Sequence, residues 1–236
     1  LPQRRGSAIQ AGMEQAMNTL PFRFRDTTLV ALPSGALHWP DERLLVVSDL
    51  HFGKSARLSA VGGAALPPYE TRDTLLRLEA DLEATEAERV ICLGDSFDTA
   101  QVEGELPEAD RVWITRLQAG RTWVWIEGNH DPGPVALGGA HLAELRIAGL
   151  LFRHIATQGA EGEVSGHYHP KARLKLRGRT LSRPCFLLDT SRLILPAYGA
   201  YTGGLRSDSA ALCDLMAGDA RAILTGPRPI AIPMPR

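Results

Sequence analysis

Apolar residues along the first half of the chain fall into two alternating patterns. Short continuous runs of apolar and β-branched residues at 44–48, 89–93 and 121–126 are typical of strands that are buried on both faces. Residues 69–82 and 108–119 instead place leucine, isoleucine and valine at helical spacing among charged residues. Strands and helices that alternate in this way predict a parallel sheet with helices on its faces.

Short strand patterns dominate the rest of the chain. Residues 24–31 and 36–39 flank the turn sequence Pro33-Ser34-Gly35 and predict a hairpin. After residue 131 helical patterns become scarce, which predicts a β-rich, antiparallel half. We expect its strands at residues 149–153, 162–165, 173–177, 185–188 and 192–195. Together the two halves favour an α/β fold in which two β-sheets pack face to face with helices outside.

The chain divides into one domain and a short extension. Residues 21–236 show no linker, repeat or low-complexity tract and are expected to form a single domain. Residues 1–20 are expected to form a flexible or helical N-terminal extension. Residues 226–236 contain four prolines and are expected to be an extended surface segment.

Composition limits the classes of protein that fit. Hydrophobic residues make up 44% of the chain, enough for a sizeable core, and the net charge of −1 argues against a general polycation. No apolar stretch approaches the roughly 20 residues of a membrane span, so we expect no membrane association. Cys92, Cys185 and Cys213 form no CxxC pair, and Cys92 and Cys185 lie in apolar strand-like runs and are expected to be buried free thiols. Free buried thiols favour a reducing compartment, and we expect the cytoplasm.

Metal-binding side chains follow several of the predicted strands. In an extended chain, Asp49 and His51 point the same way and could hold one metal together, and the same spacing recurs at His167 and His169. The carboxylate of Asp95 could bridge two cations. The segments concerned are Asp49-Leu50-His51, Gly94-Asp95, Gly128-Asn129-His130-Asp131, Arg153-His154 and Gly166-His167-Tyr168-His169.

Each of these segments alone has an ordinary explanation as a turn or a surface histidine pair. Five of them in order, each at the end of a predicted strand, instead predict a two-metal site, and most such sites hydrolyse phosphate esters. The donors are oxygen and imidazole without thiolate. That set suits Mn²⁺, Fe or Zn²⁺.

The same segments resemble the full motif series of the calcineurin-like metallophosphoesterases over roughly residues 44–170. Longer stretches resemble the bacterial ligase-associated DNA damage response phosphoesterase, and the match extends from about residue 24 onward. These stretches are Asp49-Leu50-His51-Phe52-Gly53-Lys54, Leu93-Gly94-Asp95-Ser96-Phe97, Gly166-His167-Tyr168-His169-Pro170 and residues 195–204.

The resemblance implies a fold and an activity. The fold would be a four-layer αββα metallophosphoesterase sandwich of two mixed β-sheets flanked by helices. The activity would be that of a Mn²⁺-dependent phosphodiesterase and DNA endonuclease in DNA repair, with two divalent metal ions as cofactors. DNA would be the substrate, and a DNA ligase, a helicase and a nuclease would be pathway partners.

The resemblance also implies roles for individual residues. A metal-bridging hydroxide would attack phosphorus. His130 would stabilise the phosphate and protonate the leaving oxygen, and Asp131 would orient His130. The first metal would be held by Asp49, His51, Asp95 and His169, and the second by Asp95, Asn129, His154 and His167, with Asp95 bridging.

One ligand position departs from the family pattern. Ile155 follows His154, where many metallophosphoesterases have glycine or an acidic residue. His141 is therefore a rival ligand. We favour His154 because it ends a strand-like run, whereas His141 lies in a stretch that reads as helical. His38 lies in the predicted hairpin and is expected to be an ordinary surface histidine.

A stripe of cations follows the last motif. Five cationic residues alternate with apolar residues or glycine. In a strand this spacing would place all five cations on one face, where like charges repel unless a polyanion binds them. A nucleic-acid backbone is the obvious partner, and an ordinary solvent-facing strand is the alternative. The cations are Lys171, Arg173, Lys175, Arg177 and Arg179, and they alternate with Ala172, Leu174, Leu176 and Gly178.

Other functions remain open at this point. A pyrophosphatase acting on a nucleotide-linked lipid precursor should carry an apolar cap or groove near the site, and no such insertion separates the motifs. A general phosphomonoesterase has the same ligands. A non-catalytic scaffold of the same fold should have lost ligands, but here every ligand position is filled.

Overall fold

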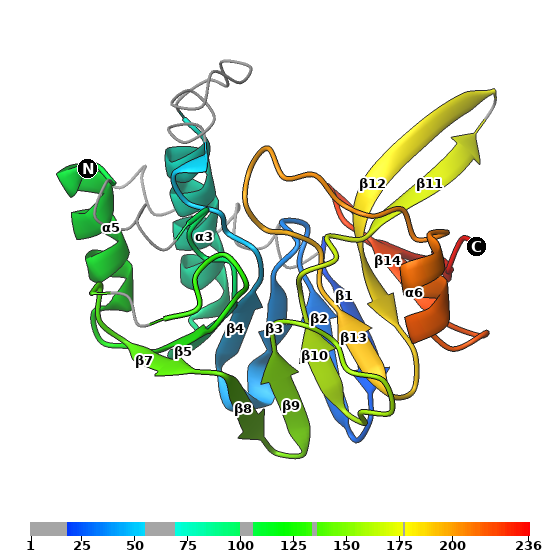
Figure 1. Ribbon diagram of the computed structural model, residues 1–236, viewed down its shortest axis with the longest axis horizontal. Coiled ribbons are helices and arrows are strands. Elements are labelled where there is room, and N and C mark those ends of the chain that lie inside the picture. The colour runs from blue at the N-terminus through cyan, green and yellow to red at the C-terminus, as the bar shows by residue number, and fades with distance from the viewer. Residues whose placement is uncertain (1–17, 55–68, 100–105, 134–135, 177) are drawn as a thin grey trace, which may run out of the picture.

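Two β-sheets packed face to face form the centre of the structure (Figure 1). The structure is a computed structural model, and it describes residues 18–54, 69–99, 106–133, 136–176 and 178–236. In the described part of the chain, no helix is long and apolar enough to cross a membrane. Cys92 and Cys185 are buried free thiols, as predicted, and Cys213 is a free, partly buried thiol.

The first sheet has seven strands in chain order. Its first four strands pair antiparallel, and β4 to β7 pair parallel. The strands are β1 (Leu20–Phe24), β2 (Thr27–Ala31), β3 (Leu37–Trp39), β4 (Leu44–Val47), β5 (Arg89–Leu93), β6 (Thr122–Ile126) and β7 (Ala140–Leu142). A 3₁₀ turn, η1 (Pro40–Glu42), joins β3 to β4.

The second sheet is also mixed, and its order is β15-β14-β12-β13-β10-β9-β8, with β11 paired to β12. The pairs β9–β10 and β10–β13 are parallel, and the others are antiparallel. The strands are β8 (Glu144–Ile147), β9 (Leu150–Arg153), β10 (Glu163–Ser165), β11 (Lys171–Leu176), β12 (Arg179–Leu188), β13 (Arg192–Ile194), β14 (Arg221–Leu224) and β15 (Ile230–Pro233).

Helices cover the outer faces of both sheets. The long helices α3 (Glu70–Thr85) and α5 (Glu108–Gln118) lie on the first sheet, and the short helix α6 (Ala210–Leu215) lies on the second (Figure 1). One apolar cluster fills the space between the sheets, and one lies under the helices on each side. This order of layers confirms the predicted four-layer α/β metallophosphoesterase sandwich.

Strand β4 shows why the continuous apolar runs are buried. All four of its residues are buried. Leu45 and Val47 point into the cluster under α3 and α5, whereas Leu44 and Val46 point into the cluster between the sheets. A strand covered on both faces can carry apolar residues at every position, because successive side chains alternate between the faces.

Helix α3 confirms the helical pattern. Leu75, Leu78 and Leu82 are buried at helical spacing and pack on the first sheet, while Leu76 is 55% exposed. The apolar stripe is therefore narrower than the leucine content alone indicates. It orients the helix so that Arg77 and Asp81 lie toward the segment that follows β13.

Several expectations about local structure need correction or lie outside the description. The stretch around His141 is not helical, because residues 140–142 form β7 and residues 144–147 form β8. The C-terminal segment is not merely an extended surface segment, since Ile230–Pro233 pairs with β14 as β15. Residues 1–17 of the expected N-terminal extension lie outside the described residues.

Candidate metal centre and active site

The predicted metal-binding side chains meet at one edge of the two sheets. They fall into groups whose ligand atoms lie within 4.8 Å of one another, and the strands that precede them are β4, β5, β6, β9 and β10. Two of these groups contain only predicted ligands. The groups are Asp49, His51 and His169, and Asp95, His154 and His167.

Backbone pairing continues past the ends of β4 and β5 and fixes the two loops that carry carboxylates. The amide of Asp49 donates to the carbonyl of Gly94 at 3.2 Å, and that of His51 donates to the carbonyl of Asp95 at 2.9 Å. Beyond them, Phe52 and Phe97 form an isolated parallel bridge. The loops therefore behave as a short extension of the sheet, which holds their side chains in place.

The backbone of the site is strained. Five of its residues have φ between 45° and 70°, a region that residues with a Cβ atom rarely adopt. Such conformations persist where the surrounding structure fixes them, and they gather at functional sites. The residues are Asp49, His51, Asp95, His167 and His169.

Glycine is required beside two of the ligands. Gly94 has φ of 79°, and a Cβ atom there would lie 2.5 Å from Nδ1 of His154. A Cβ atom on Gly128 would lie 2.1 Å from the amide nitrogen of Asp95. The motif glycines therefore allow the backbone of one loop to approach the side chains of the next.

The group of Asp49, His51 and His169 has the chemistry of a metal site. Nε2 of His169 lies 3.0 Å from Oδ1 of Asp49. Both of these atoms, and both ring nitrogens of His51, are buried without a hydrogen-bond partner among the described residues. Buried polar atoms without partners are costly, and a divalent cation would satisfy Oδ1 of Asp49, Nε2 of His169 and one ring nitrogen of His51 at once. The donor set therefore fits a metal ion.

The group around His154 also fits a metal ion. Nδ1 of His154 lies 2.7 Å from the carbonyl of Leu93, and because a carbonyl only accepts, Nδ1 carries the proton. Nε2 is left with its lone pair, the arrangement typical of metal-binding histidines. Around this Nε2 lie Asn129 Oδ1 at 3.0 Å, His167 Nδ1 at 3.2 Å and Asp95 Oδ2 at 3.3 Å.

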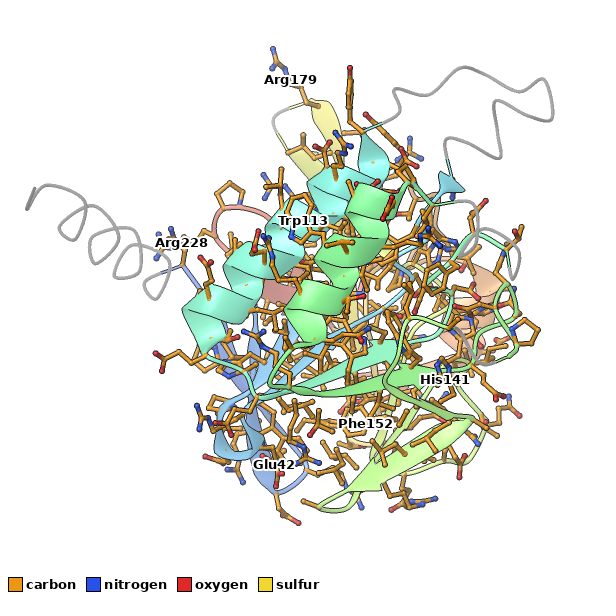
Figure 2. All side chains as sticks on the ribbon, turned by 90° about the vertical axis from the view of Figure 1, so that its left-hand side faces the viewer. Glu42, Trp113, His141, Phe152, Arg179 and Arg228 are labelled. Carbon is orange, nitrogen blue, oxygen red and sulfur yellow. The ribbon has the colours of Figure 1, made fainter. Side chains whose placement is uncertain are left out.

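The rival histidine lies elsewhere. His141 is in β7, with its ring stacked on Trp125 at 6.5 Å between centroids, and it belongs to none of the groups of candidate ligands (Figure 2). His38 is half-buried in β3, and burial lowers its pKa. Ile155 is 43% exposed, while the His154 ring beside it is buried among the candidate ligands.

Asp95 occupies the middle of the site. Burial alone would raise the pKa of its carboxyl, but without metal the hydrogen bond and charge of a protonated His154 hold that pKa at about 2. Its Oδ1 accepts a hydrogen bond from the amide of His130 at 2.9 Å, and its Oδ2 faces His154. Oδ2 therefore belongs to the group around His154, while Oδ1 is fixed by the backbone of the loop that carries His130.

His130 lies at the surface of the site. Its side chain is 39% exposed, and Nε2 lies 4.0 Å from Oδ2 of Asp95. Its Nδ1 lies 2.9 Å from the carbonyl of Asp98, so Nδ1 is the donor and Nε2 is the nitrogen available for proton transfer.

Asp98 is a site residue that sequence reasoning missed. Its buried carboxylate lies 3.3 Å from Nδ1 of His51, and it forms a third group of candidate ligands with His51 and His130. Its position three residues after Asp95 was the available signal. Asp95 and Asp98 are both buried in this short loop, which distinguishes the loop from a simple turn at the surface.

The structure corrects the expected role of Asp131. Its Oδ1 accepts hydrogen bonds from the amides of Asp95 and Gly128, and its Oδ2 accepts them from the amides of Ser96 and Phe97. A carboxylate with four backbone donors is fully engaged. Asp131 therefore shapes the loop that carries Asp95, and the hydrogen bond of the His130 ring is to the carbonyl of Asp98.

The stripe of cations is a hairpin rather than one strand. Strand β11 ends at Leu176, and β12 begins at Arg179. Arg173 pairs with Ser182, and Arg179, three residues from Ser182, therefore points to the opposite face. The expectation that all five cations share one face is wrong for Arg179, and Arg177 lies outside the described residues. The hairpin projects from the sheet, with Arg179 at its outer end (Figures 1 and 2).

Comparisons with known proteins agree with this site. The model of the calcineurin-like phosphoesterase family matches residues 42–189, which include every predicted metal ligand. No curated protein sequence matches the chain. The crystal structure of nuclease MPE from Pseudomonas putida is 30% identical, covers 90% of this chain and 100% of its own, and superposes with a TM-score of 0.70.

A second solved structure is much less similar. It is a conserved uncharacterized protein from Streptococcus pneumoniae, described as a predicted phosphoesterase, with 12% identity and a TM-score of 0.30. The alignment covers 80% of this chain and 96% of that one, and the likeness is too weak to carry an argument. The match over residues 42–189 and the nuclease neighbour are sufficient: the chain belongs to the calcineurin-like phosphoesterase family and is a metal-dependent phosphoesterase.

Proposed function

We propose that the protein is a two-metal phosphodiesterase that cuts DNA as an endonuclease. The observation that carries the proposal is the pair of adjoining metal-ligand groups, around Asp49 and around Asp95, in a chain that is similar to a nuclease over 90% of its length. Two divalent ions bound there would neutralise charge on the phosphate and activate water for attack on phosphorus.

The residues of the chain have separate tasks in this reaction. Asp49, His51 and His169 would hold one ion, and Asn129, His154 and His167 the other, with Asp95 shared. As an imidazolium, His130 would donate the proton of Nε2 to the departing oxygen, since its Nδ1 proton is held by the carbonyl of Asp98 and its ring is open to solvent. Asp131 would keep Asp95 in place through the loop backbone.

The metal we propose is Mn²⁺. The ligands are carboxylate and amide oxygens with imidazole nitrogens, and no thiolate belongs to the groups within the described residues. This set suits Mn²⁺, with Fe or Zn²⁺ as competitors, better than it suits a thiolate-rich structural zinc site.

The proposed setting is DNA repair. It is supported by the resemblance of residues 195–204, and of the segments around Asp49, Asp95 and His167, to the ligase-associated phosphoesterase. A DNA ligase, a helicase and a nuclease are the pathway partners that this resemblance implies.

Hydrolysis of three substrates side by side tests the proposed function. With Mn²⁺, the dialysed protein should hydrolyse bis(p-nitrophenyl) phosphate and nick plasmid DNA, and p-nitrophenyl phosphate should react more slowly. Excess chelator should abolish all activity, because the proposed chemistry needs bound metal. Faster hydrolysis of the monoester would favour a general phosphomonoesterase, and activity that survives chelation would exclude the two-metal reaction.

We also propose that one face of the β11–β12 hairpin contacts the phosphate backbone. Lys171 pairs with Pro184 and Arg173 with Ser182, so these two cations share a face. The opposite face carries Ala172, which is buried in the cluster under α6. The face of Lys171 and Arg173 is therefore the one turned away from this cluster, and Lys175 has the same parity along the strand.

Substitutions that remove charge from one face or the other show which face of the hairpin contacts DNA. Arg173→Ala/Lys175→Ala should lower the slope of log K for DNA binding against log salt by roughly 0.7–0.9 for each phosphate that the protein no longer neutralises. Arg179→Ala, on the other face, should leave the slope unchanged, as should Arg146→Ala on β8, the matched control. Equal slopes in all variants would make the hairpin an ordinary solvated surface.

A further inference from the structure

A second cavity lies at the same edge of the sheets as the metal centre. It has a volume of about 650 Å³ and is lined by parts of both sheets, α3 and the segment that follows β13. None of the candidate metal ligands lines it. The cavity is therefore separate from the site of chemistry, although the two lie side by side.

The segment of residues 196–202 is the wall between them. In Figure 1 it is the orange chain that rises between α3 and the β11–β12 hairpin. The amides of Tyr198 and Gly199 donate to the carbonyls of Ser48 and Asp49 at 2.8 and 3.1 Å. A nucleic-acid strand bound at the metal centre would have to pass over only this segment to enter the cavity.

The wall is fixed to the elements on both sides. Arg77 donates to the carbonyl of Tyr198, and Tyr198 donates to Asp81 at 2.8 Å, which ties the wall to α3. On the other side, Nζ of Lys171 donates to the carbonyl of Thr202 at 2.9 Å. Because the wall is already fixed, binding of a ligand does not carry the entropic cost of ordering it.

The charged residues in the cavity favour an anion. Arg77 and Lys171 line it, and Asp81 is the only acid among its lining residues. Asp81 already accepts the hydroxyl of Tyr198, and burial raises its pKa. The guanidinium of Arg77 lies over the Tyr198 ring, 4.6 Å from its centroid, and its Nε is buried without a hydrogen-bond partner in the described part of the chain. Its positive charge therefore adds to that of Lys171 at the cavity, and cations suit a phosphate.

An aromatic side chain stands at the rim. Tyr201 lines the cavity and is 45% exposed, with φ of 54°. Its neighbours fix this strained conformation, because the amide of Ala200 donates to Thr74 and the carbonyl of Thr202 accepts from Lys171. Exposed aromatic rings beside cations are the usual platform for unpaired bases.

We propose that the cavity is a binding site for an unpaired nucleotide of the substrate strand, next to the phosphate that is cleaved. Lys171 contacts the phosphate of this nucleotide, the nearby charge of Arg77 attracts it, and Tyr201 stacks on its base. The inference rests on the proposed function and names the part of the substrate that this chain recognises beyond the reacting phosphate. Lys171 also belongs to the cationic face of the hairpin, so the strand would continue from the cavity along that face.

Binding of a labelled single-stranded oligonucleotide, followed by fluorescence anisotropy, tests the cavity directly. Stacking on one base corresponds to a factor of about 5 to 150 in affinity, so Tyr201→Ala should raise Kd by a factor in that range. Tyr201→Phe keeps the aromatic face and should bind like wild type. Lys171→Gln keeps a donor for Thr202 and should lower the salt slope by about 0.7.

Kinetics on two substrates separate this inference from the proposed function. Tyr201→Ala should raise the KM for the oligonucleotide relative to the KM for bis(p-nitrophenyl) phosphate, which has no flanking nucleotide. Val112→Ala, an exposed apolar position on α5, is the control and should change neither value. A Tyr201→Ala variant with wild-type Kd and KM for the oligonucleotide would overturn the inference, as would an equal rise in both KM values. Failure of the wild type to hydrolyse either substrate would overturn the proposed function, while binding would still decide whether the cavity holds a nucleotide.

Discussion

Asp95→Ala should remove both metal ions and reduce hydrolysis of every substrate to less than about 1% of wild type. Even a residue that only orients a metal ligand is worth roughly 10–100-fold in affinity or activity, and Asp95 has one oxygen toward His154 while the other accepts the amide of His130. Removal of this carboxylate affects both halves of the site at once. Metal content measured by elemental analysis, together with hydrolysis of bis(p-nitrophenyl) phosphate, tests the expectation.

His141→Ala is the matched control for this experiment. It also removes a side chain that could bind metal, but it does so in β7, where the ring stacks on Trp125. Metal content and activity should therefore stay near those of wild type. Retention of one ion in Asp95→Ala would show that the ions are held independently, and loss of metal in His141→Ala would return His141 to the ligand set.

The central strands and the ligand segments could be predicted because each has a strong local signal. The apolar run of β5 was placed at residues 89–93, and the structure has the strand at Arg89–Leu93. A strand that is buried on both faces has apolar residues at nearly every position, so its apolar run is easy to recognise in the sequence. The ligand residues follow these strands directly. Once the strands are known to be parallel neighbours, their carboxyl ends must meet at one edge.

Elements near the edges of the sheets were harder to predict. The stretch from Ala140 to Ile147 reads as helical because alanine, leucine and glutamate favour helices. Here it forms β7 and β8, whose side chains are all at least partly exposed, so pairing with β6 and β9 rather than burial decides their conformation. Tertiary pairing of this kind is invisible in local sequence.

The contacts of Asp131 and Asp98 could not be predicted for a different reason. Both are acids beside predicted ligands, and sequence spacing alone does not say which backbone amides a carboxylate will meet. The folded loops bring the amides of Asp95, Ser96 and Phe97 to Asp131, which leaves the Asp98 carbonyl to hold His130. The roles of Asp131 and Asp98 therefore depend on how two distant loops meet in the fold. Ser96 and Asp131, for example, are 35 residues apart in sequence.

His130→Ala should separate proton donation from metal binding. General acid catalysis contributes about 10²–10⁴-fold, so cleavage of DNA should fall by a factor in that range, because its alkoxide leaving group needs a proton. Hydrolysis of bis(p-nitrophenyl) phosphate should fall much less, because p-nitrophenolate is stable without one. The ratio of the two losses, measured on the same preparation with saturating Mn²⁺, is the decisive quantity.

Metal content decides between the two roles that the geometry allows for His130. The residue lies outside the groups around Asp49 and Asp95 but forms a third group with His51 and Asp98. A proton donor should leave both ions bound when it is removed, since its Nδ1 is held by a carbonyl and its Nε2 is 4.0 Å from Asp95. Loss of an ion, with equal losses on both substrates, would make His130 a ligand, and the proton for the leaving oxygen would then have to come from solvent.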